Sequence, residues 1–113
     1  MPEDAEVIKF LPNGSDISDT NLPTYGDQPG NAGNDWIILR YSDVLLMHAE
    51  AIMEGNDTAD NNAIDSYMKV RVRAGFDAIA DRPGVLTVGA LLLERRVELA
   101  FENHRFFDLV RFG

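Results

Sequence analysis

The stretch LRYSDVLLMHAEAIME, residues 39–54, decides the fold of this 113-residue chain. Its apolar residues recur every three or four positions, which places them on one face of an α-helix. The residues of this stripe are Ile38, Tyr41, Leu45, Ala49 and Ile52, widened by Val44, Met47 and Ala51. Gly55 and Asn56 follow, and both residue types tolerate the left-handed backbone that commonly ends a helix. We therefore predict a helix over residues 39–54.

Three more helices are predicted after this stretch. The second runs from about residue 59 to residue 74 and stops at Gly75. The third covers residues 88–102 after a capping Thr87, and it is apolar almost all round, which predicts burial between neighbouring helices. The fourth is short, residues 104–112. This alternation predicts an all-α fold of antiparallel, tetratricopeptide-like helix pairs, although the second pair is not a sequence copy of the first.

The N-terminal third of the chain has a different composition. Residues 1–35 are rich in Gly, Pro, Asn and Asp, and carry seven acidic residues against the single base Lys9. A short apolar patch at residues 7–11 is compatible with one strand or with an extended packing segment, and the rest indicates a long loop. We therefore divide the chain into an irregular segment, residues 1–35, and a helical segment, residues 36–113.

Composition excludes several classes of function. The net charge of −9 argues against a nucleic acid partner, which requires clustered Lys and Arg. The absence of cysteine excludes disulfides, a thiol nucleophile and lipidation on this piece. No run approaches the roughly 18 apolar residues of a membrane span, and the acidic start is unlike a signal peptide. We expect the chain as given to be soluble and unanchored.

Charged residues occupy unexpected positions on two predicted helices. Arg71 falls near the middle of the apolar arc of the second helix, and three glutamates form a ladder at four-residue spacing on the third. An unpaired buried charge is costly, and arginine suits partly buried pairs with carboxylates, so we expect an inter-helix ion-pair network. The residues of this network are Arg71, Glu94, Glu98, Glu102, Arg105 and Arg111. Paired glutamates could instead act as general acid and base, but arginine neighbours keep carboxylates ionised and favour the structural interpretation.

Other chemistry finds little support in the sequence. His48 and His104 have neither a cysteine nor a second histidine at ligand spacing, so no metal site is predicted. No serine lies in a Gly-x-Ser-x-Gly motif, and the glycines near residues 26–33 lack the lysine and strand–helix context of a phosphate-binding loop. We predict no catalytic residue and no cofactor.

Two aromatic residues, Tyr25 and Trp36, lie in the Gly- and Asn-rich part of the chain. Because sugar rings pack on aromatic faces, both are candidates for ligand binding. Trp36 has a simpler alternative role as a hydrophobic staple onto the first helix, and we favour that role.

Three blocks of the chain together resemble the SusD/RagB family. NDWIILRYSDVLLMHAEA (34–51) resembles the family's Arg-Tyr-Ala-Asp-Val-Leu-Leu-x-x-Ala-Glu-Ala helix, and VRVRAG (70–75) resembles its Val-Arg-x-Arg-Ala-Gly helix end. ERRVELAFENHRFFDLVRFG (94–113) resembles its Glu-Arg-x-x-Glu-Leu-x-x-Glu-Gly-x-Arg-x-x-Asp-Leu-x-Arg-Trp-Gly block. The departures are Ser42 for Ala, Asn103 for Gly and Phe112 for Trp. Asn103 fits the same helix break because Asn tolerates a left-handed backbone.

The resemblance implies a C-terminal segment of a surface-exposed outer-membrane lipoprotein of Bacteroidetes-type bacteria, lipid-anchored in its full-length form. Such proteins bind glycans, or in some members peptides, and form a lid over a TonB-dependent, SusC-like transporter. They have a tetratricopeptide-like helical fold and perform no catalysis. The matched blocks are scaffold motifs, so no ligand-binding residue is carried over from them.

Two other functions remain open. The chain could be a helical protein–protein interaction module without sugar binding, and more distantly a glycoside hydrolase that uses the paired glutamates. A piece of a larger helical array exposes apolar surface where its neighbours would pack, so we also expect self-association.

Overall fold

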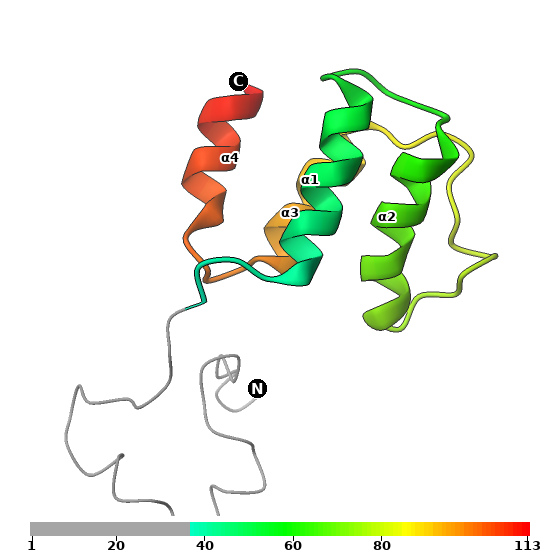
Figure 1. The fold of residues 1–113 in the computed structure, drawn as a ribbon, viewed down its shortest axis with the longest axis horizontal. Coiled ribbons are helices and arrows are strands. Elements are labelled where there is room, and N and C mark those ends of the chain that lie inside the picture. The colour runs from blue at the N-terminus through cyan, green and yellow to red at the C-terminus, as the bar shows by residue number, and fades with distance from the viewer. Residues whose placement is uncertain (1–36) are drawn as a thin grey trace, which may run out of the picture. The chain divides into compact units, whose positions relative to one another are not determined.

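The computed structural model describes residues 37–113, which form four α-helices (Figure 1). The helices are α1 (Tyr41–Met53), α2 (Asn61–Arg73), α3 (Val88–Glu98) and α4 (His104–Phe112). The predicted all-α fold is confirmed for this part of the chain. The predicted irregular segment 1–35, with its possible strand, and the candidates Tyr25 and Trp36 lie outside the described residues.

The helix ends follow from local chemistry. The Asp60 side chain accepts a hydrogen bond of 2.7 Å from the backbone N–H of Asn62 at the start of α2. Thr87 caps α3 in the same way, since its hydroxyl accepts from the backbone N–H of Ala90 at 3.1 Å. Such caps satisfy N–H groups that have no partner within the helix. After α1 the backbone is left-handed at Glu54 and Gly55, with φ of 48° and 79°.

Helix α3 ends four residues before the predicted end at residue 102. The backbone is left-handed at Phe101 (φ 65°) and Asn103 (φ 62°), and a helix cannot continue through this conformation. The expected helix break at Asn103 is thus present, and Phe101 adds a second left-handed residue. A bulky residue rarely adopts this conformation, which costs on the order of 1 kcal/mol. Together the two residues reverse the chain between α3 and α4.

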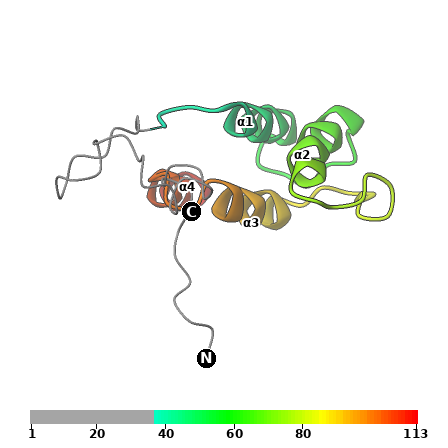
Figure 2. The same cartoon turned by 90° about the horizontal axis from the view of Figure 1, so that it is seen from below.

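The four helices form two layers (Figure 2). The chain runs in opposite directions in α1 and α2, and again in α3 and α4, so the helix pairs are antiparallel as predicted (Figure 1). Helix α1 packs on both α2 and α3, and α4 packs on α3. Leu86 lies in the segment between α2 and α3. Two backbone hydrogen bonds of 2.9 and 2.8 Å join it to Thr58, which lies between α1 and α2.

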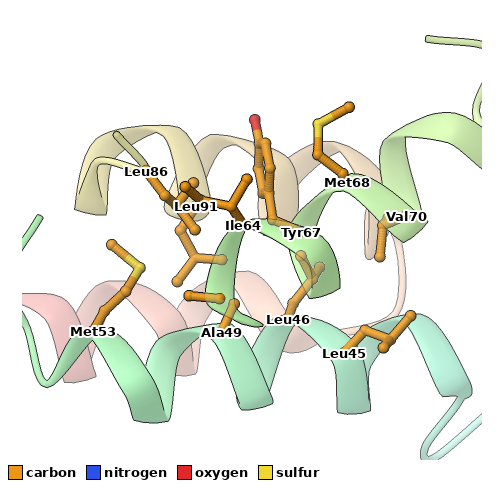
Figure 3. Packing of buried hydrophobic residues seen from close by; sticks show 11 residues of the cluster. Leu45, Leu46, Ala49, Met53, Ile64, Tyr67, Met68, Val70, Leu86 and Leu91 are labelled. Carbon is orange, nitrogen blue, oxygen red and sulfur yellow. The ribbon is translucent and has the colours of Figure 1, made fainter. Parts of the chain in front are cut away.

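The hydrophobic core lies between α1, α2 and the start of α3 (Figure 3). Its fully buried members include Leu46 and Ala49 from α1, Ile64 from α2, Leu91 from α3, and Leu86 from the segment just before α3. Full burial of one such leucine stabilises the fold by about 1.5–3 kcal/mol. None of the described helices is long and apolar enough to cross a membrane.

Two helices contribute less to this core than their composition suggests. The prediction that α3 is buried all round is wrong for the described part of the chain, because Leu93 and Val97 are 58% and 65% exposed. Residues 37–113 provide neighbours on one side of α3 only. Helix α4 adds only the partly buried Phe112 to the core, and Asp108 is its one buried residue.

Candidate functional site: ion pairs between the helices

The most deeply buried ion pairs in residues 37–113 centre on Arg95 of α3, whose side chain is 2% exposed. Its Nη1 donates to Oδ1 of Asp43 on α1 at 2.9 Å, and its Nε donates to Oδ2 of Asp108 on α4 at 3.0 Å. Burial lowers the pKa of Arg95, but the hydrogen bonds that it donates to Asp108 and Asp43 outweigh this effect and leave the pKa above its usual value. One charged guanidinium therefore ties three helices together. We call Asp43, Arg95 and Asp108 the central triad.

Sequence reasoning missed the central triad, although a signal for it exists. Arg95 lies one turn after Leu91 and one turn before Leu99, and both leucines are buried. A residue four positions from each of two core leucines faces the same side of the helix. On α1, Asp43 lies three residues before the buried Leu46, and this spacing also places two residues on the same side of a helix.

A second group forms around Arg40, immediately before α1. Its Nε donates to both carboxylate oxygens of Glu102, at 3.0 and 2.9 Å. Its Nη1 also contacts the carboxylate of Glu98 and the hydroxyl of Ser42, and Arg73 of α2 pairs with Glu98 from the other side. Burial lowers the pKa of Arg40, but the hydrogen bonds that it donates to Glu102 and Glu98 outweigh this effect, so the pKa lies above its usual value. Arg40 thereby joins the start of α1 to the end of α3.

Arg71 forms a third group, between α2 and α3. Its Nη1 donates to Oε2 of Glu94 at 2.9 Å. The guanidinium also lies over the ring of Phe76, 3.6 Å from the ring centroid, and 5.4 Å from the centroid of Tyr67. Burial raises the pKa of the Tyr67 hydroxyl. These cation–π contacts explain how a charged residue fits into an apolar arc. Its buried Nε has no hydrogen-bond partner in the described structure.

Two expected members of the network lie elsewhere. Arg111 pairs with Glu50 of α1 at 2.9 Å and with Asp108 at 3.0 Å, not with the glutamate ladder. The reason is direction: α4 runs antiparallel to α3, so its C-terminal end lies away from Glu98 and Glu102 at the end of α3 (Figure 1). Arg105 makes no ion pair within residues 37–113, and its buried Nη1 has no hydrogen-bond partner there.

These contacts define what the ladder can do chemically. General acid–base catalysis needs a carboxyl group placed to exchange a proton with a substrate. Glu94, Glu98 and Glu102 are instead each bound to an arginine guanidinium from another part of the fold. Their ion pairs hold neighbouring parts of the fold together, which is a structural role. No group of three or more His, Asp or Glu residues in the described part of the chain is placed to hold a metal ion.

One further polar contact joins α1 and α2. His48 Nδ1 lies 2.9 Å from the hydroxyl oxygen of Ser66, a buried residue. In a catalytic arrangement a third group would orient the histidine, and the hydrogen bonds of residues 37–113 provide none. The pair acts as a hydrogen bond between two helices.

Comparison with known proteins identifies the family. The model of the SusD family matches residues 14–113, and the chain belongs to this family. A SusD-like protein of Bacteroides ovatus is 30% identical over 105 residues, which cover 92% of this chain and 18% of the relative. A SusD-like protein of Formosa agariphila is 35% identical over 103 residues, covering 82% of this chain and 18% of the relative. The chain thus spans under a fifth of the length of these curated relatives. No solved structure matches it.

Proposed function

We propose that this chain is the C-terminal part of a non-catalytic nutrient-binding protein of the outer membrane, which binds a glycan or a peptide and delivers it to a SusC-like, TonB-dependent transporter. The observation that carries this proposal is the SusD family match over residues 14–113. In this proposal the protein is surface-exposed and lipid-anchored in its full-length form. The described helices act as a rigid scaffold, because ion pairs and an apolar core join them at several points.

The ligand-binding candidates proposed are Tyr25 and Trp36, and for Trp36 the competing role is the hydrophobic staple onto the first helix that we favour above. Their support is chemical: an aromatic ring offers a flat apolar face to a sugar, in a part of the chain rich in Gly and Asn. The scaffold residues around Arg95 and Arg40 are not proposed to touch ligand, since their polar groups are engaged between helices.

The experiment measures binding of a panel of oligosaccharides and peptides to the full-length protein by isothermal titration calorimetry, because this chain spans under a fifth of its curated relatives. Tyr25→Ala is expected to lower the affinity for the best ligand at least tenfold. Trp36→Ala should do the same if Trp36 binds ligand, whereas in the staple role it should lower the stability of the fold and leave affinity unchanged. Tyr41→Ala is the matched control, because Tyr41 is an aromatic residue 70% exposed on the scaffold, and its loss should leave affinity unchanged. Absence of binding to any oligosaccharide or peptide would overturn the proposal.

Transport is tested separately: the genes beside this one are searched for a SusC-like transporter, and co-purification of the two proteins is then measured. A stable complex is expected, and its absence would remove the transporter from the proposal while leaving ligand binding intact.

The alternatives have their own readouts. A helical interaction module would bind a protein partner and no sugar, and the apolar surface of α3 and α4 favours this second candidate. A glycoside hydrolase would release reducing sugar and lose that activity in Glu98→Gln. We expect no turnover from the wild-type protein, because Glu98 is held by two arginines.

A further inference from the structure

Large apolar side chains are exposed on the outward sides of α3 and α4. We call these residues the α3–α4 face, and they are Leu93, Val97, Phe101, Phe106, Phe107 and Val110. On α4, Phe106 and Val110 project opposite to the buried Asp108, because two residues correspond to a rotation of about 200° on a helix. The same spacing relates Leu93 to the buried Leu91 on α3. The face is thus turned away from the buried side of both helices.

Arg105 is a charged residue within this apolar surface. It lines one shallow pocket together with Phe101, Phe106, Phe107 and Asn103. Its Nη1 is buried and has no hydrogen-bond partner within residues 37–113. A buried donor that is left unpaired costs about 1–3 kcal/mol, and more when it is charged. A guanidinium matches the geometry of a carboxylate, so the pocket calls for an acidic side chain that the described helices do not supply.

The two sides of this helix stack differ in polarity. In a stack of helix pairs an inner pair buries apolar side chains on both sides, whereas a terminal pair has a polar outer side. The helices form two layers, and the exposed residues of the first layer on α2 are mainly polar (Figure 2). They include Asn62, Asp65, Lys69 and Arg73. The apolar α3–α4 face instead has the composition of an inner pair, which is covered by a further layer.

The chemistry of the face disfavours a second copy of this chain as that layer. A two-fold axis would bring the same face of both copies together. The residues of this face include no carboxylate, so the Nη1 of Arg105 would gain no charged acceptor from its copy. The net charge of −9 would also make two copies repel each other. The covering layer must therefore differ in sequence from the face that it covers.

The length of the relatives indicates where such a layer comes from. This chain spans 18% of the SusD-like proteins of Bacteroides ovatus and Formosa agariphila described above. A partner on the same polypeptide has an effective concentration on the order of millimolar, which favours it over a separate molecule. The fraction of surface that a protein buries also rises with its chain length. Both effects favour cover by other parts of the same polypeptide.

From these observations we propose that, in the full-length protein, the α3–α4 face is covered by a further helical layer of the same polypeptide, and that an Asp or Glu of this layer pairs with Arg105. The inference rests on the proposed function in one respect, that this chain is the C-terminal part of a longer protein. The covering layer presents apolar side chains to the phenylalanines and one carboxylate to the pocket. The face is then buried, so nutrient and transporter must bind elsewhere on the protein.

The test is photo-cross-linking of the full-length protein, with the photoreactive amino acid p-benzoylphenylalanine in place of Phe106. Copies labelled with heavy nitrogen are mixed with unlabelled copies before irradiation, and cross-linked peptides are identified by mass spectrometry. We expect a cross-link to a peptide that precedes these 113 residues, with both ends from one isotope. Cross-links of mixed isotope would assign the face to a second copy and overturn the proposal. A cross-link to residues 1–36, or none at all, would overturn it as well.

A charge exchange tests the pairing of Arg105. Arg105→Glu should lower the melting temperature of the full-length protein, because it places two carboxylates together. Changing the acidic residue of the cross-linked peptide to arginine in the same protein should restore most of the loss. Arg82→Glu is the matched control: Arg82 pairs with Asp65 at the surface, so the same acid-to-arginine change should not rescue it. If no acidic residue of the peptide restores Arg105→Glu, the pairing is refuted.

The outcome is independent of the test of nutrient binding. A full-length protein that binds an oligosaccharide or peptide but forms no cross-link within one polypeptide would refute this inference alone. A protein that forms the cross-link but binds no ligand would refute the proposed function and leave the covered face in place.

Discussion

Replacing Arg95 with methionine is expected to destabilise the fold more than any other single change to a charged residue in the described helices. Methionine is close to arginine in length and fills the space that the aliphatic part of Arg95 occupies. The change therefore removes the charge with little loss of volume. It leaves Asp43 and Asp108 facing each other across a site where their side chains are 4% and 2% exposed.

The expected magnitude follows from what each carboxylate retains. Asp108 keeps its pair with Arg111 at 3.0 Å, but that arginine is 47% exposed and compensates only in part. Asp43 loses the arginine that pairs with it in the described structure. Removing one partner of a buried pair costs about 3–5 kcal/mol. A helical unit of this size has a free energy of unfolding of about 5–10 kcal/mol, so the variant should lose a large part of its stability.

The assay is urea unfolding followed by circular dichroism at 222 nm. The triple variant Asp43→Leu, Arg95→Met, Asp108→Leu should recover most of the loss, because replacing all members of a buried charge group by hydrophobic residues of similar volume is often close to neutral. Arg82→Met is the surface control: it removes a pair with Asp65 whose side chains are 33% and 55% exposed, and should cost less than about 1 kcal/mol. A loss in Arg95→Met no larger than in Arg82→Met would refute the reasoning.

Three further substitutions test other parts of the fold. Leu46→Ala should lower the free energy of unfolding by about 2–5 kcal/mol in the same urea assay, because Leu46 is fully buried between α1 and α2. Thr87→Ala should cost about 1 kcal/mol, since it removes the cap that accepts from Ala90; an unchanged midpoint would show that the cap is dispensable. For Tyr67, burial raises the pKa in the folded state, so its contribution to stability is complete below the unfolded pKa of about 10 and is lost as pH rises through the folded pKa. Tyr67→Phe cannot titrate and should resist alkaline unfolding at pH 10–12 better than the wild type, as followed by circular dichroism; identical pH profiles would contradict this.

Helix positions could be predicted from the sequence because their causes are local. The spacing of apolar residues, the cap at Thr87 and the left-handed Asn103 all act within a few residues of each other. The end of α3 was placed too late because Phe101 adopts a left-handed backbone that its residue type disfavours. A local pattern of residue types gives no sign of such a conformation at a phenylalanine.

Partners of the buried charges were harder to predict for a related reason. Periodicity marks a charge that faces the core, but not which partner it meets there. Arg71 meets Glu94, whereas Glu98 and Glu102 meet Arg40, a residue outside any helix that reaches them because the start of α1 lies beside the end of α3. The central triad depends equally on the arrangement of three helices. Tyr25 and Trp36 stay predictions, because they precede the described residues.

The way in which α4 is attached has a consequence for how the molecule opens. Its buried residue is the charged Asp108, and its main attachments to the rest of the fold are the pairs of Asp108 with Arg95 and of Arg111 with Glu50. Regions with few buried apolar contacts exchange their amide hydrogens at a lower free energy than the core. In hydrogen exchange α4 should therefore behave as a separate unit that detaches before α1 and α2 unfold. Each such opening admits water to Arg95 and Asp43 while the apolar core stays closed.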